Sequence, residues 1–419
     1  MMRRLLLACA VSGLAGLPAA GNAETLDEAT AAAFETNPSL AAARARLRAT
    51  RELEPQAWSE AFPALGLNAD ATRDRGDLGD TETWSARLEA EQLLFSGGRV
   101  LAATRQARAN VAGAVANFSG TSQQLALDVA AAYAGVRQAE AIVAARQTTV
   151  ANLQRQFEYA TAQFETGLVT RTDVAQSQAR LAQARTQLVQ AQGRLSAAVE
   201  SYLRLVGHPP SDLSAPPAAS GLPASLDDAL DRAGRQSPTL NFARASAQAA
   251  DAGTDIAIAN FLPNISLFAN TTVSDDFDST PGDFNADQVG VRVAWSLFTG
   301  GFNRSRTRQQ RALSAAARLD VSAAERSVRE TVTTSWTGLT SARAAVASAR
   351  EQVSAAELAY EGITLEQETG LRSTIDVLIQ EQDLLDARLA LAQAERDLVV
   401  AERQLLAAIG ALAPDTPAE

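Results

Sequence analysis

One eleven-residue stretch occurs twice in this chain and constrains its fold more than any other feature. Residues 164–174 read FETGLVTRTDV, and residues 367–377 read QETGLRSTIDV. A long helical pattern enters each copy and another leaves it. The glycine of each copy can take the left-handed conformation that ends a helix, and the hydroxyls of Thr172 and Thr374 can cap the helix that follows. Each copy therefore predicts the tip of a long helical hairpin.

The duplication extends over the whole chain. Asn37-Pro38 matches Ser237-Pro238 at an offset of 200 residues, and Phe95-Ser96-Gly97-Gly98 matches Phe298-Thr299-Gly300-Gly301 at an offset of 203. A Pro-rich stretch between the copies breaks the helical pattern. The sequence therefore predicts a first repeat over residues 24–207 with its tip at 166–173, a linker over 208–224, a second repeat over 225–410 with its tip at 369–376, and a tail over 411–419.

Residues 1–23 have the pattern of a secretory signal peptide. A basic start is followed by an apolar run that is too short to span a bilayer, and small residues precede Glu24. The only cysteine, Cys9, lies inside this segment, so the mature chain would have no disulfide. The formal net charge of −11 argues against a nucleic-acid partner.

The long helical patterns carry apolar residues at every seventh position. Such a heptad spacing predicts helices that supercoil against partner helices. These positions are Val129, Val136, Val143, Val150, Phe157 and Phe164 in the first copy, and Val332, Leu339, Val346, Val353 and Tyr360 in the second. The returning helices continue the spacing with Val174, Leu181, Leu188, Leu195 and Tyr202, and with Val377, Leu384, Leu391, Leu398 and Leu405.

Between the short helices and the long ones, each copy changes to a period of two. Alternating apolar and polar residues predict strands over about 64–72, 84–94, 264–273 and 288–298, and only Phe268 interrupts the polar side. One such hairpin alone fits a soluble domain, but two at equivalent places favour strands that face lipid on one side and water on the other. Four strands cannot close a spanning barrel, so several chains would have to contribute strands to one barrel.

The sequence offers no catalytic or cofactor-binding constellation. His208 is the only histidine and lies in the linker, and the metal clusters built from Cys and His are excluded once Cys9 is removed. The glycine pairs at 97–98 and 300–301 lack the pattern of a phosphate loop, and the chain contains no lysine. We therefore expect neither an enzyme nor a bound metal or cofactor.

Strands, glycine joints, paired long hairpins and Thr-Gly-Leu tips occur here in an order that resembles the TolC family of outer-membrane factors over the whole mature chain. The resemblance implies a mainly α-helical protomer with a small transmembrane β part, and a homotrimer that forms a twelve-stranded barrel continued by a periplasmic helical tunnel. It also implies a location in the Gram-negative outer membrane, in contact with lipid. A periplasmic adaptor and an inner-membrane pump of the RND or ABC type would be partners, for multidrug efflux or type I protein secretion.

The resemblance also implies a gate at the hairpin tips. Arg372 on the second hairpin matches a residue that latches the family's resting tip, with Thr172 and Asp173 as its partners on the first hairpin. Gln367 stands where a related protein has a tyrosine, so one closing contact is altered or lost.

Asp376 is implied as the acid of a pore constriction, three per trimer. The family's second acid ring would fall at Ile379 and is absent, and Asp383 is a candidate substitute, although a solvated helix face also explains it. Three carboxylates around one lumen would favour cations and raise their own pKa values. We therefore expect a cation-selective pore.

Adaptor proteins of the family bind at the hairpin tips, where this chain has Gly167, Leu168, Gly370 and Leu371. Packing within the tip explains the two leucines equally well. The main alternative for the whole chain is a soluble periplasmic coiled-coil adaptor or scaffold, which would also carry a long hairpin. The paired strands argue against that alternative.

Overall fold

The structure is a computed structural model that describes residues 23–76, 79–276 and 284–413. The predicted signal peptide, apart from Ala23, lies outside the described residues. So do the predicted tail from residue 414 onward, residues 77–78 and residues 277–283. The predicted repeat boundaries stay a prediction.

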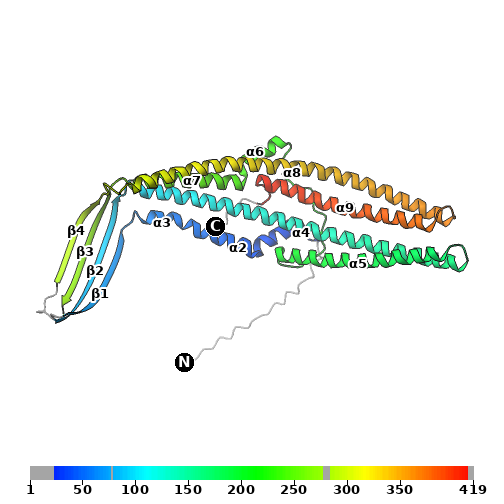
Figure 1. The fold of residues 1–419 in the computed structure, drawn as a ribbon, viewed down its shortest axis with the longest axis horizontal. Helices are drawn as coiled ribbons and strands as arrows, with labels where there is room; N and C mark the ends of the chain where they lie inside the picture. The colour runs from blue at the N-terminus through cyan, green and yellow to red at the C-terminus, as the bar shows by residue number, and fades with distance from the viewer. Residues whose placement is uncertain (1–22, 77–78, 277–283, 414–419) are drawn as a thin grey trace, which may run out of the picture. The chain divides into compact units, whose positions relative to one another are not determined.

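Long helices and one sheet make up the described chain (Figure 1). The elements in chain order are α1 (Leu26–Thr36), α2 (Pro38–Arg51), α3 (Leu53–Ser59), β1 (Ala64–Gly76), β2 (Gly79–Phe95), α4 (Arg99–Glu165), α5 (Arg171–Val206), α6 (Leu226–Gln236), α7 (Pro238–Ala259), β3 (Asn264–Asp276), β4 (Phe284–Ala294), α8 (Phe302–Glu368) and α9 (Thr374–Ile409). The helices α4 and α8 contain 67 residues each, and α5 and α9 contain 36 each. None of the described helices has a stretch that is both long and apolar enough to cross a membrane.

The chain divides into two compact units, and the long helices pass from one to the other. Of the described residues, the strand unit comprises 38–76, 79–127, 220–276, 284–343 and 401–413, and the hairpin unit comprises 23–37, 128–219 and 344–400. The strand unit holds the sheet, and the hairpin unit holds both helical tips.

The strand unit contains one antiparallel sheet in the order β1-β2-β3-β4, so β1 and β4 are its edges. The first three strands are longer than predicted. β1 continues from residue 72 to Gly76 because its charged end pairs with the start of β2, and Arg73 forms an ion pair with Glu82 at 3.0 Å.

The predicted limits of the fourth strand, 288–298, are wrong at both ends. β4 begins at Phe284 and ends at Ala294, because Ala294 pairs with Asn264, the first residue of β3. Trp295 therefore has no strand partner, and its indole Nε1–H donates to the carbonyl of Phe261 at 3.0 Å.

The two faces of the sheet differ in polarity, as the alternation predicts. One row across the four strands consists of Leu65, Ala90, Ala269 and Val289, and the next row on the opposite face consists of Gly66, Glu89, Asn270 and Gln288. Exposed leucine and valine side chains gather on the first face, where Leu65 and Val289 are 77% and 79% exposed. A face of this kind needs an apolar partner or lipid.

Phe268, the exception on the polar face, fills a notch beside Gly290 on the next strand. A Cβ atom at Gly290 would lie 2.9 Å from the ring of Phe268, so a larger residue there would force the ring to shift. The guanidinium of Arg292 covers the same ring, 4.6 Å from its centroid. Because of this cation–π contact, a charged group lies over the ring, and this face of the sheet stays polar.

Polarity of the two faces can be tested with arginine substitutions on one strand. Val291→Arg places a charge on the apolar face, and in a lipid-facing strand this costs about 2–4 kcal/mol near the bilayer midplane. We expect a sharply lower yield of folded protein in outer-membrane fractions. The control Gln288→Arg, on the polar face, should retain the wild-type yield, and equal losses from both variants would contradict the assignment.

Candidate gate at the hairpin tips

The first tip joins α4 to α5 through a left-handed glycine. Gly167 has φ of +76°, and the Leu168 N–H donates to the carbonyl of Gln163 at 2.9 Å. The hydroxyl of Thr170 then caps α5: it donates to the carboxylate of Asp173 at 2.7 Å and accepts from the Asp173 N–H. This reciprocal capping box fixes the start of the returning helix.

The second tip repeats these bonds between α8 and α9. Gly370 has φ of +81°, and the Leu371 N–H donates to the carbonyl of Glu366 at 2.9 Å. Ser373 takes the capping role, with its hydroxyl 2.8 Å from a carboxylate oxygen of Asp376. The prediction that Thr172 and Thr374 are the caps is therefore wrong, because a capping box needs its acid three residues after the hydroxyl.

The candidate adaptor-binding positions form the ends of the two tips. Leu168 and Leu371 are 75% and 77% exposed, next to Gly167 and Gly370. The two turns have the same backbone geometry, so each presents its leucine to a partner in the same way. Their role in binding an adaptor stays a prediction.

Arg372, the candidate latch residue, pairs within its own hairpin. Its Nε–H donates to a carboxylate oxygen of Glu366 at 2.7 Å. Among the described residues, no hydrogen bond or ion pair joins Arg372 to Thr172 or Asp173. Thr172 is exposed and Asp173 caps α5, so a latch between these residues stays a prediction.

Asp376, the candidate constriction residue, accepts hydrogen bonds at the start of α9. The hydroxyl of Ser373, and then its N–H, lower the pKa of Asp376, which keeps the carboxylate charged at neutral pH. The predicted rise in this pKa requires three chains around one lumen and stays a prediction. Ile379 is about half exposed at 47%, and Asp383 is exposed further along α9.

A buried polar cluster further from the tips joins the two hairpins and was missed from the sequence. The carboxylate of Glu381 on α9 is only 3% exposed and accepts a hydrogen bond from the amide of Asn152 on α4 at 2.9 Å. The hydroxyls of Thr149 on α4 and Tyr360 on α8 also donate to it. We call these four residues the hairpin clasp.

A buried apolar cluster includes Leu153, which directly follows Asn152 of the clasp. Leu153 on α4, Leu181 on α5 and Leu378 on α9 pack together in this cluster. Burial raises the pKa of Glu381, although the hydrogen bonds from Asn152, Thr149 and Tyr360 oppose the rise. Burial also raises the pKa of Tyr360, to about 12, and the charge of Glu381 adds to this rise.

Gln367 supplies a second polar contact between the hairpins. Its side chain is buried, and its amide Nε2 lies 3.3 Å from Oε1 of Gln156 on α4 and 3.4 Å from the hydroxyl of Thr374. Gln367 therefore contacts the first hairpin through Gln156, and its part in closing the tip stays a prediction.

The sequence contained a signal for the clasp. Glu381 lies four residues after Val377 and three before Leu384, and both of these are buried. Residues at these spacings share one helix face, so an acid there must either be paired or disrupt the packing. Asn152 on the partner helix gives no comparable signal, because contacts between distant segments are not visible in a sequence.

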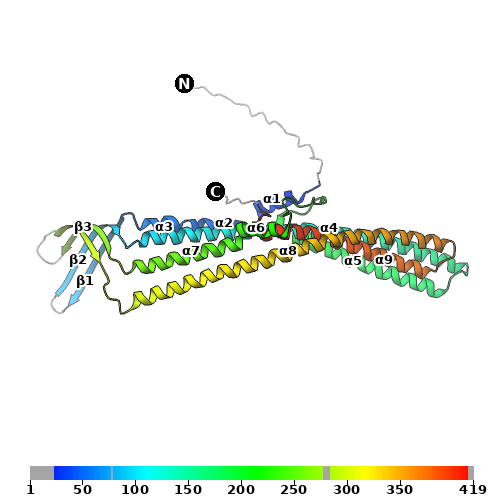
Figure 2. The same cartoon turned by 90° about the horizontal axis from the view of Figure 1, so that it is seen from above.

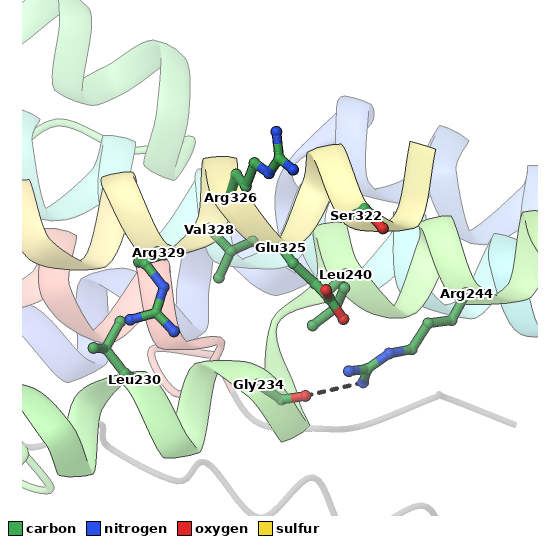
Figure 3. Close-up of a pocket in the computed structure, with 9 residues that line it drawn as sticks. All are labelled: Leu230, Gly234, Leu240, Arg244, Ser322, Glu325, Arg326, Val328 and Arg329. Carbon is green, nitrogen blue, oxygen red and sulfur yellow. Dashed lines mark hydrogen bonds between the residues drawn. The ribbon is translucent and has the colours of Figure 1, made fainter. Parts of the chain in front are cut away.

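The described chain shows no metal-binding group beside these contacts. No group of three His, Cys, Asp or Glu residues that could hold a metal ion occurs among the described residues. A pocket of about 440 Å³ in the strand unit lies among α6, α7 and α8 (Figure 3), and in it Arg244 donates to the carbonyl of Gly234 at 2.9 Å. Its lining includes arginine, leucine and valine but neither cysteine nor histidine.

The fold defines a class of protein whose chain combines a four-stranded antiparallel sheet with two long helical hairpins that have capped tips. Figures 1 and 2 show these strands and helices from two directions. The outer membrane channel CmeC of Campylobacter jejuni has the same fold, with a TM-score of 0.83 and 13% identity over 94% of this chain and 87% of that one.

The chain belongs to the outer membrane efflux protein family, whose sequence pattern matches residues 30–208 and 229–411. It is 32% identical to the outer membrane efflux protein BepC of Brucella suis over 394 residues, which cover 94% of this chain and 86% of BepC. It is 29% identical to the outer membrane protein TolC of Vibrio cholerae, over 98% of this chain and 96% of that protein.

The clasp predicts how substitutions of Glu381 change stability. Glu381→Ala leaves the buried amide of Asn152 and the half-buried hydroxyl of Tyr360 without their acceptor and should lower the free energy of unfolding by about 1–3 kcal/mol. Glu381→Gln keeps an acceptor oxygen and removes the buried charge, so it should be tolerated. Asp383→Ala, on the exposed face of α9, is the control and should leave the free energy of unfolding unchanged in denaturant titrations.

The same cluster predicts a pH dependence. Because the pKa of Glu381 is raised above 4.5 in the folded chain, its contribution to stability is fully present below pH 4.5 and is lost as pH rises through the folded pKa. Wild type should therefore lose stability relative to Glu381→Gln across this range. A constant difference between the two proteins from pH 4 to pH 7 would contradict the raised pKa.

Proposed function

We propose that three copies of this chain form an outer-membrane channel-tunnel, gated at the hairpin tips, through which substrates leave the cell envelope. The observation that carries this proposal is the joining of two capped hairpins by a buried clasp. A joint of this kind holds the tips together in one state, and the loss of a few polar contacts can release them.

Two features support assembly of the chain with itself. The described sheet ends at β1 and β4, and the open edges of a sheet cannot face lipid. Three sheets joined edge to edge would pair them in a closed barrel of twelve strands. On α8, Leu358 and Leu365 are one heptad apart and are 72% and 63% exposed. Their spacing fits packing against a helix of another chain.

The proposed channel works with partners on the periplasmic side. A periplasmic adaptor would bind the exposed leucines at the tips, and an inner-membrane pump of the RND or ABC type would supply the energy. The name of BepC favours efflux as the process, and type I protein secretion is the second candidate. Each process moves a substrate without changing it, so the proposal requires no catalytic residue or cofactor.

A soluble coiled-coil scaffold is the alternative, and the sheet argues against it. A scaffold could use the long hairpins, but it would have no use for leucine and valine side chains gathered on one exposed face. We further propose that the two hairpins derive from tandem repeats over residues 24–207 and 225–410, because both tips have the same glycine turn and capping box.

The latch can be tested by single-channel recording in planar bilayers. Arg372→Ser should increase the conductance several-fold if Arg372 holds the tip against the first hairpin or a neighbouring chain. The control Glu366→Gln removes only the ion pair within the hairpin, and an exposed pair of this kind contributes less than about 1 kcal/mol. Equal conductance in Arg372→Ser, Glu366→Gln and wild type would place the latch elsewhere.

The constriction can be tested by measuring ion selectivity. Asp376→Asn removes the charge and keeps an oxygen acceptor for Ser373, and we expect the cation-to-anion permeability ratio to fall at least about threefold. Asp173→Asn makes the same change in the capping box of the first tip and should leave the ratio unchanged. An unchanged ratio in Asp376→Asn would remove Asp376 from the constriction.

A further inference from the structure

Glu24 is held in the hairpin unit by hydrogen bonds from three segments. Its backbone N–H donates to the carbonyl of Asp212 at 2.7 Å, and its carbonyl accepts from the N–H of Ser214 at 3.0 Å. The hydroxyl of Tyr133 on α4 also lies 2.7 Å from this carbonyl. One residue thus makes a short parallel bridge to the linker and a contact with a buried tyrosine.

The side chain of Glu24 is buried as well, at 8% exposure. Its carboxylate accepts from the hydroxyl of Tyr202 on α5 and from the N–H and hydroxyl of Ser211, at 3.2 and 3.1 Å. The imidazole Nε2 of His208 lies 3.6 Å from the same carboxylate. Burial, followed by the bond to Glu24, raises the pKa of Tyr202, so the phenol stays a donor.

Acidic groups act on the residues that hold Glu24. Burial is the main cause that raises the pKa of Tyr133. The charges of Glu24 and Glu28 add to this rise, and the charge of Arg137 opposes it. Partial desolvation raises the pKa of Glu140, two turns further along α4; the charge of Arg137 opposes this rise and the charge of Asp212 adds to it. Glu24 therefore carries a buried carboxylate of its own, its nitrogen bonds to Asp212, and Glu28 lies one turn further along the chain, so a positive charge added at this nitrogen would have acidic neighbours.

We propose that hydrolysis of the Ala23–Glu24 peptide bond supplies this charge, and that the new α-ammonium group of Glu24 locks the start of the mature chain to the linker. A signal peptidase would add water across the bond, so that Ala23 leaves with a carboxylate and the Glu24 nitrogen takes up a proton. The nitrogen keeps its bond to the carbonyl of Asp212, and its additional N–H groups gain acidic neighbours. This inference does not depend on the proposed channel function.

The composition of the chain makes the experiment unusually selective. The chain contains no lysine, so the α-amino group is the only primary amine of the protein. Mass spectrometry of the detergent-purified protein should place the N-terminus at Glu24. Acetylation with N-hydroxysuccinimidyl acetate should then add one group per chain, at Glu24.

The rate of acetylation measures how firmly the ammonium is held, because only the neutral amine reacts. A free α-amino group has a pKa of about 7.7–8.0, and a rise of one unit makes the reaction about sevenfold slower at pH 7.5. We expect at least this slowing relative to a synthetic peptide of residues 24–30, and the lock should weaken as pH rises through the raised pKa. Tyr133→Phe removes the hydroxyl that holds the Glu24 carbonyl and should speed acetylation, whereas Tyr159→Phe on the same helix should not.

A mature chain that begins at another residue would overturn the proposal. So would a wild-type rate equal to that of the peptide, because it would show an amine without acidic partners. Both results can be read on the wild-type protein, so they do not depend on whether a variant folds.

Discussion

Apolar side chains at every seventh position of the long helices are the constraint on which the rest of the structure depends. Five of these side chains are at most 1% exposed: Val129, Val136, Val332, Leu339 and Val377. A single helix cannot bury its own outer face, so other helices must cover them. The spacing directs one face of every long helix toward a neighbour over many turns. Helices of this length need such a continuous seam, because short-range propensity alone does not hold them in place.

The seam also determines where polar groups have structural consequences. Glu381 replaces an apolar residue on this face of α9, and its carboxylate is stabilised there by donors from α4 and α8. Replacing a buried apolar contact by a paired acid weakens the joint and makes it sensitive to the loss of any one partner. We regard this weakness as suited to a gate, since hairpins that must separate cannot be joined by apolar packing alone.

Much of the fold could be predicted from the sequence because it follows from local periodicity. The heptad spacing predicts the four long helices, and the alternation predicts the four strands, as the structure confirms. Periodicity was less reliable where pairing between strands sets the limits of a strand. β4 ends at Ala294 because this residue pairs with Asn264, the first residue of β3, and no pattern within residues 288–298 contains that information.

The candidate gate shows the same limit. The tips were predictable because glycine, leucine and an acid recur within a few residues, whereas the caps proved to be Thr170 and Ser373. The hairpin clasp joins residues more than 200 positions apart, from Asn152 to Glu381, and only the fold brings them together. Glu24 was predicted as the first mature residue, but its contacts with Tyr133, Tyr202 and the linker were not.

The central claim is that separation of the two hairpins opens the channel, and a reversible bridge between them tests it most directly. Cysteines in place of Gln156 and Gln367, whose side chains meet at 3.3 Å, would be the only thiols once Cys9 is removed with the signal peptide. The pair would be joined by a short cleavable bis-thiol reagent while the protein is in a planar bilayer. The account predicts low conductance with the bridge intact, even with Arg372→Ser present, and a rise when the bridge is cleaved. The same conductance before and after cleavage would contradict it.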